Sequence, residues 1–286
     1  MTVNFIKNLA REFDIRPTSQ KGQNFLVDED VLARIIERAD IRRADKVLEI
    51  GPGFGILTKQ LLDKGAVVLA VEMDKKLANH MRETFSEYKN LQILEKDILK
   101  VSNQEIYDAL HGEFRVVSNI PYQITGKIIK KFLSSDLPKP KDAVLLVQKE
   151  VAERVCAKAG DMSLLALSVQ LYSDPKICFD VSKDAFWPVP KVDSSLLRMQ
   201  NISEKPRYDV DESRFWQVAR IGFSSPRKQL RNNLANGLPA KGWPSSGWQI
   251  NQADVKLALH EAGLSETARA QELDVKDWIK LIHTLD

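Results

Sequence analysis

Short apolar runs alternate with longer amphipathic segments through the first 150 residues, and this alternation limits the fold more than any other feature. The apolar runs have the length and residue types of β-strands, and they lie at residues 47–50, 67–71, 91–94, 114–118 and 143–147. Helical periodicity predicts helices at residues 29–39, 53–62, 75–88, 126–133, 150–159 and 163–172. Regular β/α alternation predicts a parallel sheet with helices on both faces.

The pattern changes in the second half of the chain. Residues 177–181 and 194–199 predict a closing hairpin at the edge of the sheet. A polar stretch follows at residues 200–208, and the periodicity from residue 211 onward is helical apart from a Gly, Pro, Ser and Trp segment at 237–247. We therefore predict an α/β fold in two parts. A domain built on the parallel sheet covers residues 1–204, with an N-terminal arm at 1–24, and a small all-α domain covers residues 205–286.

The composition narrows the possible classes of protein. Lys and Arg number 42 against 39 Asp and Glu, a net charge of +3, so a polyanion would bind at local basic patches. Two scattered cysteines and four histidines show no metal-ligand spacing, so we expect no metal site and a reduced, cytoplasmic environment. The amphipathic N-terminus does not have the pattern of a signal peptide, and no apolar stretch has the length of a membrane span. We expect a monomer without a membrane partner.

A glycine-rich loop, E-I-G-P-G-F-G, joins the first predicted strand to the next helix, and its Gly51 and Gly53 allow the backbone to approach a ligand closely. Glu72, Asp97 and Asn119 follow the next three strands, and the carboxyl ends of parallel strands face one crevice. A carboxylate after the second strand can accept both hydroxyls of a ribose. One after the third strand can accept from an adenine amino group. The set predicts a site for a nucleotide-like cofactor.

The tetrapeptide Asn119-Ile-Pro-Tyr122 suits the exocyclic amine of a nucleobase. The Asn119 carboxamide oxygen and a backbone carbonyl held out by Pro121 can both accept hydrogens from such an amine. Tyr122 and Phe186 can sandwich the base. The target base must be unstacked to be reached, which favours a base in a nucleic-acid loop over one in a duplex. We predict Asn119, Pro121, Tyr122 and Phe186 as catalytic residues.

Basic residues without compensating acids gather between residues 213 and 253. Arg227, Lys228 and Arg231 stand at i, i+1 and i+4, which on a helix would present their charges to phosphates from one face. Together with Arg220 they are the predicted RNA-binding residues.

Several segments stand in the order and at the spacing of one known family. They are Gln23-Asn-Phe-Leu26, the glycine loop, Glu72, Asp97, Asn119-Ile-Pro-Tyr122 and Phe186-Trp-Pro-Val-Pro-Lys-Val-Asp-Ser194. Through them, nearly the whole chain resembles the ribosomal RNA adenine N6,N6-dimethyltransferases, specifically the bacterial small-subunit type whose loss gives kasugamycin resistance. The resemblance implies an S-adenosylmethionine-dependent Rossmann-like domain and a small helical domain. The implied substrate is two adjacent adenosines in a hairpin loop near the 3′ end of 16S RNA, in the immature small subunit.

The resemblance also implies roles for single residues. Asn24 and Leu26 would border the cofactor, and Gly51 would lie against its methionine part. Glu72 would hold the ribose, Asp97 would hold the adenine, and Asn119 would border the edge nearest the methyl group. One departure concerns Pro226, which stands where the family commonly has a further Arg, so one phosphate contact would be missing.

Three other functions stay open on the sequence. An antibiotic-resistance methyltransferase acting on one adenosine of large-subunit RNA would share the Asn-Ile-Pro-Tyr turn and the Gln-Asn-Phe-Leu arm. A non-catalytic assembly factor could bind immature subunits through the basic segment. A nicotinamide dehydrogenase would need a third glycine where Ile56 stands.

Overall fold

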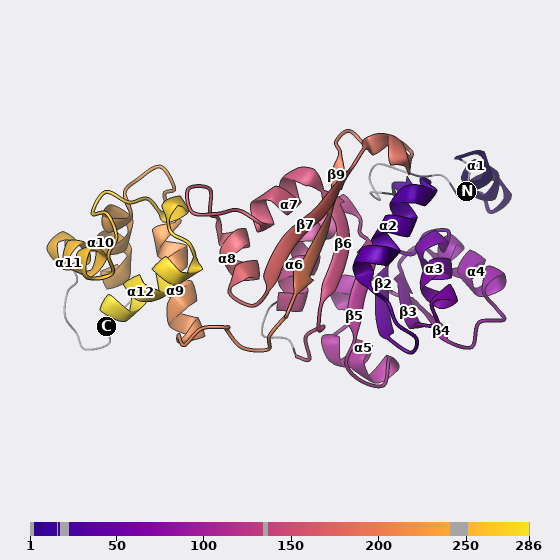
Figure 1. The fold of residues 1–286 in the computed structure, drawn as a ribbon, viewed down its shortest axis with the longest axis horizontal. Coiled ribbons are helices and arrows are strands. Elements are labelled where there is room, and N and C mark those ends of the chain that lie inside the picture. Colours follow the sequence, from indigo (N-terminus) through magenta and orange to yellow (C-terminus); the bar gives the residue numbers. More distant parts are fainter. Residues whose placement is uncertain (1–2, 16, 18–22, 134–136, 241–250, 286) are drawn as a thin grey trace. The chain divides into compact units, whose positions relative to one another are not determined.

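The computed structural model in Figure 1 describes residues 3–15, 17, 23–133, 137–240 and 251–285. Contacts between Cα atoms divide the chain into two compact units. The first holds residues 1–153 and 173–204, and the second holds residues 154–172 and 205–286. The division after residue 204 coincides with the predicted domain boundary. Residues 154–172, which we expected in the sheet domain, group with the helical unit instead.

A seven-stranded sheet with the order β4-β3-β2-β5-β6-β9-β7 forms the first unit. Its strands are β2 (Lys46–Ile50), β3 (Val67–Glu72), β4 (Leu91–Glu95), β5 (Arg115–Asn119), β6 (Ala143–Gln148), β7 (Asp174–Val181) and β9 (Ser194–Gln200). Strands β2 to β6 pair in parallel, and β9 and β7 continue the sheet antiparallel. The predicted parallel sheet and its closing hairpin at one edge are confirmed. A separate short ladder joins β1 (Phe25–Leu26) to β8 (Phe186–Trp187).

Both faces of the sheet are buried, which explains why the central strands are apolar without alternation. Successive side chains of a strand point to opposite faces, and neighbours such as Val47 and Leu48 are both fully buried. The helices of the first unit are α1 (Val3–Glu12), α2 (Glu29–Ala39), α3 (Ile56–Asp63), α4 (Lys75–Thr84), α5 (Asn103–Ala109), α6 (Thr125–Leu133) and most of α7 (Lys149–Val155). Side chains of α2, α3 and α4 share one core cluster with one face of the sheet.

Helices α4 and α7 end at Thr84 and Val155, four residues before their predicted ends, and three other helices of the first unit differ in further ways. Helix α3 begins at Ile56 rather than residue 53. Gly51, Gly53 and Gly55 all adopt positive φ, so the loop before the helix is longer than predicted. Helix α5 was not predicted, although its N-terminus carries a capping box in which Ser102 and Glu105 bond each other's backbone N–H groups. Helix α1 lies in the segment that we predicted only as an amphipathic arm.

Helix α1 packs on the part of the sheet domain that borders the glycine loop. Its buried Ile6 and Ala10 share a core cluster with Phe25, Phe54 and Leu77. The N-terminal arm therefore contributes a helix to the hydrophobic core.

The second unit consists of α8 (Leu164–Gln170), α9 (Glu212–Gly222), α10 (Leu230–Ala240), α11 (Gln252–Glu261) and α12 (Val275–Thr284). Trp278 of α12 is fully buried and stacks on Phe223 at 5.7 Å between ring centroids. The helical prediction for this part is confirmed, and most of the predicted interruption at 237–247 lies outside the described residues. No helix in the described part of the chain is long and apolar enough to cross a membrane.

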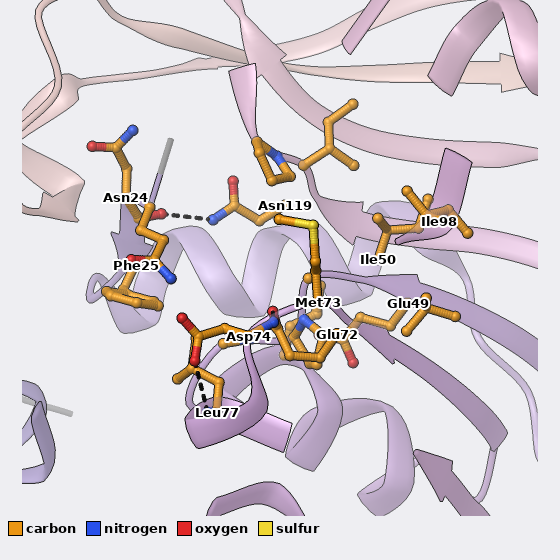
Figure 2. Close-up of a pocket in the computed structure, with 18 of the residues that line it drawn as sticks. Asn24, Phe25, Glu49, Ile50, Glu72, Met73, Asp74, Leu77, Ile98 and Asn119 are labelled. Atoms are coloured by element: carbon orange, nitrogen blue, oxygen red, sulfur yellow. Dashed lines mark hydrogen bonds between the residues drawn. The ribbon is translucent and has the colours of Figure 1, made fainter. Parts of the chain in front are cut away.

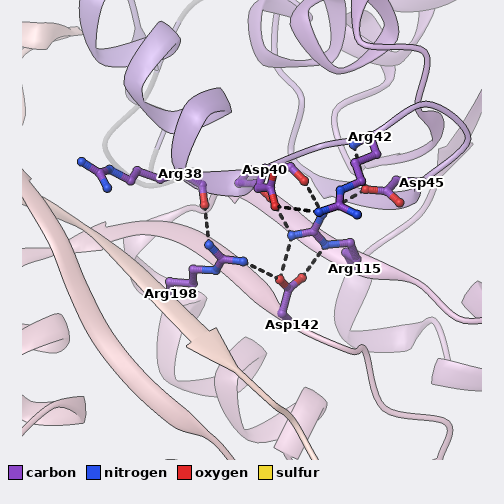
Figure 3. A network of polar contacts seen from close by, with 8 residues as sticks. Arg38, Asp40, Arg42, Asp45, Arg115, Asp142 and Arg198 are labelled. Atoms are coloured by element: carbon purple, nitrogen blue, oxygen red, sulfur yellow. Dashed lines mark hydrogen bonds and ion pairs between the residues drawn. The ribbon is translucent and has the colours of Figure 1, made fainter.

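A network of charges joins the amino-terminal ends of β5 and β6 to the end of α2 (Figure 3). Arg115 donates to both oxygens of Asp142 at 2.7 Å and to Asp45 at 3.0 Å. Arg198 of β9 donates to Asp142 at 3.3 Å. Both arginines also donate to the last carbonyls of α2. Two cations thus satisfy carbonyls that a helix end leaves free, at the negative end of its dipole.

We expect the variant Asp142→Ala to lower the free energy of unfolding by about 3 kcal/mol, because it removes the anion that two guanidinium groups share and leaves Arg115 with Asp45 alone among the described residues. Those groups are only 15% and 17% exposed. The control Glu113→Ala breaks an ion pair with Lys141 whose side chains are 68% and 60% exposed. It should cost less than about 1 kcal/mol. Chemical denaturation followed by circular dichroism measures both, and equal losses would contradict the network's role.

Candidate active site at the carboxyl edge of the sheet

Strands β2 and β5 separate at the centre of the sheet, where the strand order reverses. They pair only through Val47 with Arg115 and Leu48 with Val116. Beyond these pairs the Ser118 hydroxyl accepts from the Ile50 N–H at 3.2 Å and donates to the Ile50 carbonyl at 2.6 Å. The Ser118 side chain therefore satisfies the backbone N–H and carbonyl of Ile50, which lie beyond the paired residues of β2 and β5. Open α/β sheets bind their ligands in the crevice at such a point.

A pocket lies at this edge of the sheet and gathers most of the predicted site residues (Figure 2). The predicted residues that line it are Asn24, Leu26, Gly51, Gly53, Glu72, Asp97, Asn119, Pro121 and Tyr122. They come from β1, from the glycine loop and from the ends of β3, β4 and β5. Four consecutive parallel strands thus place residues that are far apart in sequence around one space, as their order along the chain predicted.

The glycine loop is held in a conformation that side chains would not permit. Gly53 has a φ of 59°, and a Cβ atom there would lie 2.8 Å from the ring of Phe25. Gly55 has a φ of 78°, and a Cβ atom there would lie 2.4 Å from the ring of Phe85. The loop is therefore packed between the N-terminal arm and α4, with its backbone free to face the pocket.

Two buried carboxylates face the pocket. Glu72, at the end of β3, accepts the N–H groups of Gly53 at 3.3 Å and Asp74 at 2.8 Å. Burial is the largest cause that raises the pKa of Glu72, and these backbone bonds oppose it. Burial likewise raises the pKa of Glu49 to about 8, opposed by the Thr58 hydroxyl that donates to it at 2.6 Å. Each carboxylate oxygen has two lone pairs, so Glu72 retains acceptor capacity for hydroxyl groups of a ligand.

Asp97 and Asn119 keep one polar atom each for a ligand. Asp97 caps the short helix η2 (Ile98–Lys100) by accepting the Leu99 N–H through Oδ1 at 3.0 Å. Asn119 donates through Nδ2 to the backbone carbonyl of Asn24 at 3.1 Å. This bond sets which way the amide faces. Within the described residues, the Oδ1 atom of Asn119 accepts no hydrogen bond.

The placement of Phe186 corrects one prediction. Phe186 is 1% exposed and belongs to the core cluster that also contains Leu26 of β1. It is not among the pocket-lining residues. Its strand β8 pairs with β1 so that Phe186 stands opposite Leu26. The ring is thus used for packing, because the β1–β8 ladder turns it toward the core. It does not offer a face to a base in this structure.

The basic segment also differs from the prediction. Arg227 and Lys228 lie in a turn before α10, and of the three residues expected on one helical face only Arg231 is helical. The Asn233 side chain holds this turn by donating to the carbonyls of Gly222 at 2.6 Å and Ser225 at 3.1 Å. The helix begins later than predicted because the turn contains Pro226 and is closed by these bonds. Arg227, Lys228 and Arg220 are exposed, whereas Arg231 is half-buried.

Several functional residues escaped the sequence prediction. Glu49 and Met73 line the pocket, Ser118 bridges the two strands, and Ser194 bonds Tyr122. The position of Glu49 inside the glycine motif was a signal for its role. Ser118 bonds Ile50, 68 residues away, and Ser194 bonds Tyr122, 72 residues away, so no local sequence pattern predicts either contact.

The fold and the crevice define an open α/β protein with a nucleotide-type site at its switch point, and comparisons with known proteins agree. The family model "Ribosomal RNA adenine dimethylase" matches residues 16–280. A ribosomal RNA small subunit methyltransferase A from Dehalococcoides mccartyi is 37% identical, over 96% of this chain and 90% of that protein. The protein of the same name from Geobacillus kaustophilus is 36% identical, over 98% of this chain and 94% of that protein.

Two solved structures share the fold over most of this chain. A dimethyladenosine transferase from Plasmodium falciparum is 30% identical with a TM-score of 0.73, covering 90% of this chain and 95% of its own. The 23S rRNA methyltransferase ErmE is 28% identical, also with a TM-score of 0.73, covering 92% of this chain and 99% of its own. The chain belongs to the ribosomal RNA adenine dimethylase family. It is therefore an enzyme with a methyltransferase fold, and the resemblance drawn from its motifs is confirmed.

The raised pKa of Glu49 predicts how stability varies with pH. Its value of about 8 in the folded protein exceeds the ordinary 4.5, so folding favours the protonated form. This stabilisation is complete below pH 4.5 and is lost as pH rises through 8. We expect Glu49→Gln to remove that loss, so that the variant gains stability relative to the unaltered protein between about pH 5 and pH 9.

Glu105 provides a control of opposite sign. The Ser102 N–H and Lys96 lower its pKa to about 2, so its stabilisation is present above pH 4.5 and is lost as pH falls through 2. Glu105→Gln should therefore leave the pH dependence above neutrality unchanged. Denaturant titrations across the pH range measure both variants, and a Glu49→Gln curve parallel to that of the unaltered protein would exclude a raised pKa.

Proposed function

We propose that the protein transfers methyl groups from S-adenosylmethionine to N6 of two adjacent adenosines in a hairpin loop near the 3′ end of small-subunit (16S) ribosomal RNA. The observation that carries the proposal is the Asn119 amide at the end of β5. Its Nδ2 is fixed on the Asn24 carbonyl at 3.1 Å, which leaves Oδ1 as an acceptor at the edge of the pocket. An acceptor held in this way suits an exocyclic amine, which offers two hydrogens.

The pocket residues fit S-adenosylmethionine. Glu72 keeps acceptor capacity for the ribose hydroxyls, and Asp97 keeps Oδ2 for the adenine amino group. Met73 and Ile98 provide apolar surface beside these acids. The buried carboxyl groups of Glu49 and Glu72, whose pKa values are raised, favour a ligand that carries positive charge, because a nearby cation stabilises their ionised forms. When bound, the cofactor supplies an activated methyl group on a sulfonium.

Methyl transfer to the amine requires that the protein positions the base and polarises its amino group, and it does not require a strong base. The lone pair of an adenine amine is delocalised into the ring, so acceptors for its hydrogens favour a more tetrahedral nitrogen. Asn119 Oδ1 and the carbonyl of Ile120 or Pro121 can take these two hydrogens, and Tyr122 can stack on the base. With Phe186 in the core, the second face of the base requires a different cover.

RNA binding by the helical unit stays a proposal. Exposed Arg220, Arg227 and Lys228 offer charges to phosphates, and residues 205–286 are the proposed RNA-binding domain. A monomer acting on the immature subunit in the cytoplasm, where such RNA is assembled, completes the proposal.

A second candidate is methylation of large-subunit RNA. The 23S rRNA methyltransferase ErmE and the dimethyladenosine transferase have the same TM-score of 0.73, so the fold does not separate the two substrates. Sequence relatives named for the small subunit favour the first candidate. Primer extension on both ribosomal RNAs, after incubation with protein and cofactor, identifies the modified base. Stops only in large-subunit RNA would refute the leading proposal.

We expect Asn119→Ala to reduce the rate of labelled methyl transfer to unmethylated small subunits by about 100-fold or more, because it removes an acceptor aimed at the reacting amine. The control Asn79→Ala alters an exposed residue of α4 that bonds only Arg82 within the described residues. It should transfer methyl groups at the normal rate. A fully active Asn119→Ala protein would exclude the proposed role, and ribosome maturation without methyl transfer would instead support an assembly factor.

We expect the double variant Arg227→Ala with Lys228→Ala to weaken RNA binding and to reduce the slope of log K against log salt by about 2, one for each lost phosphate contact. The affinity for S-adenosylmethionine should not change. The control Lys256→Ala removes a charge already paired with Glu266 at 2.9 Å, so its slope should match that of the unaltered protein. Filter binding at several salt concentrations gives these slopes, and an unchanged slope in the double variant would place the RNA elsewhere.

A further inference from the structure

The hydroxyl groups of Tyr122 and Ser194 lie 2.7 Å apart. Tyr122 lines the pocket and begins the single-turn helix η3 (Tyr122–Ile124). Ser194 begins β9, is fully buried, and pairs with Gln148 of β6 and Val181 of β7. The bond therefore ties the tip of a pocket ring to the interior of the sheet.

We propose that Ser194 is a positioning residue for the target base, and that it holds the Tyr122 ring in the orientation that stacks on the adenine. This inference rests on the proposed function. An aromatic side chain turns about two torsions, and the second of these is broad when nothing holds the ring. A hydrogen bond at the ring tip restricts both torsions, so the stacking face is formed before the base arrives. The arrangement also accounts for a tyrosine at a position where stacking alone would accept phenylalanine.

The hydroxyl pair does not act as a proton relay. Burial raises the pKa of Tyr122, the Ser194 bond opposes this to a lesser extent, and the charge of Asp193 adds the smallest of the three effects, in the raising direction. The phenol therefore stays neutral at the pH values at which ribosomes are stable. Loss of the bond should change the rate and leave the shape of the pH profile unchanged.

The neighbouring serine provides a matched control. Ser195 is also fully buried and is the second residue of the same strand, but its hydroxyl donates to Asp180 at 2.7 Å on the opposite face of β9. Ser194→Ala and Ser195→Ala each delete one buried hydroxyl from adjacent positions. Only the first deletion touches the ring of the pocket.

The first experiment measures methyl transfer to unmethylated small subunits. We expect Ser194→Ala and Tyr122→Phe each to lower kcat/KM for RNA about tenfold, with no effect on the dissociation constant of S-adenosylmethionine. The double variant should be no worse than either single variant, because both delete the same bond. Ser194→Thr should restore activity, and Ser195→Ala should stay near the normal rate. Normal turnover by Tyr122→Phe, or equal defects in Ser194→Ala and Ser195→Ala, would overturn the inference.

The second experiment does not depend on the substrate. Protein labelled with 3-fluorotyrosine has five tyrosine signals, one for each Tyr of the sequence, and Tyr122→Phe assigns one of them. We expect Ser194→Ala to shift or broaden that signal alone, because the ring is released, whereas Ser195→Ala should not. An unmoved signal would overturn the inference. Absence of methyl transfer by the unaltered protein would instead overturn the proposed function, so the two failures are distinguished.

Discussion

The fork between β2 and β5 is the constraint on which the site depends. A parallel ladder that continued past Leu48 and Val116 would close the crevice, yet a ladder that simply stopped would leave buried backbone groups of Ile50 unpaired. Ser118 resolves this conflict, because its one hydroxyl both accepts from and donates to Ile50. The strands can therefore part without the cost of orphaned polar groups. The glycine loop leaves β2 on one side of the fork, and the Asn-Ile-Pro-Tyr turn leaves β5 on the other.

Buried charged groups are paired at the amino ends of the parallel strands and are without a counter-ion at the carboxyl ends, among the described residues. At the amino ends, Arg115, Asp142 and Arg198 are paired with one another and with the end of α2, so each buried charge has a partner. At the carboxyl ends, Glu49 and Glu72 are buried with only hydroxyl and backbone donors, and their pKa values rise. Uncompensated buried acids weaken a fold, and they persist where a ligand completes them. This contrast locates the site by electrostatics, independently of any motif.

Periodicity and strand order predicted most of what depends on local sequence. The five parallel strands, the edge hairpin and the convergence of Glu72, Asp97 and Asn119 follow from alternation and from the geometry of parallel sheets. The buried placement of Phe186 could not be predicted, because the two-residue ladder between β1 and β8, which turns this ring inward, joins segments about 160 residues apart. The basic residues were misplaced on a helix for a different and local reason, since Asn233 closes the preceding turn by bonding carbonyls 11 and 8 residues earlier. Contacts such as the β1–β8 ladder, in contrast, span far more than one window. Tertiary contacts of this kind have no signature in a window of sequence.

The N-terminal arm and β1 couple the glycine-loop side of the pocket to the Asn119 side. Phe25 of the arm fills the space that a side chain on Gly53 would need, and the carbonyl of Asn24 fixes the amide of Asn119. The same short segment thus shapes the glycine loop and orients the Asn119 amide. A shift of β1 relative to β8 would disturb the glycine loop and the Asn119 amide at once. The ladder that holds β1 against β8 has only two residue pairs, so it offers little resistance to such a shift. Helix α1 counters such a shift by burying Ile6 and Ala10 beside Phe25 and Phe54. The arm and β1 are therefore a structural part of the pocket, which explains why Asn24 and Leu26 line it beside residues that follow the strands of the sheet.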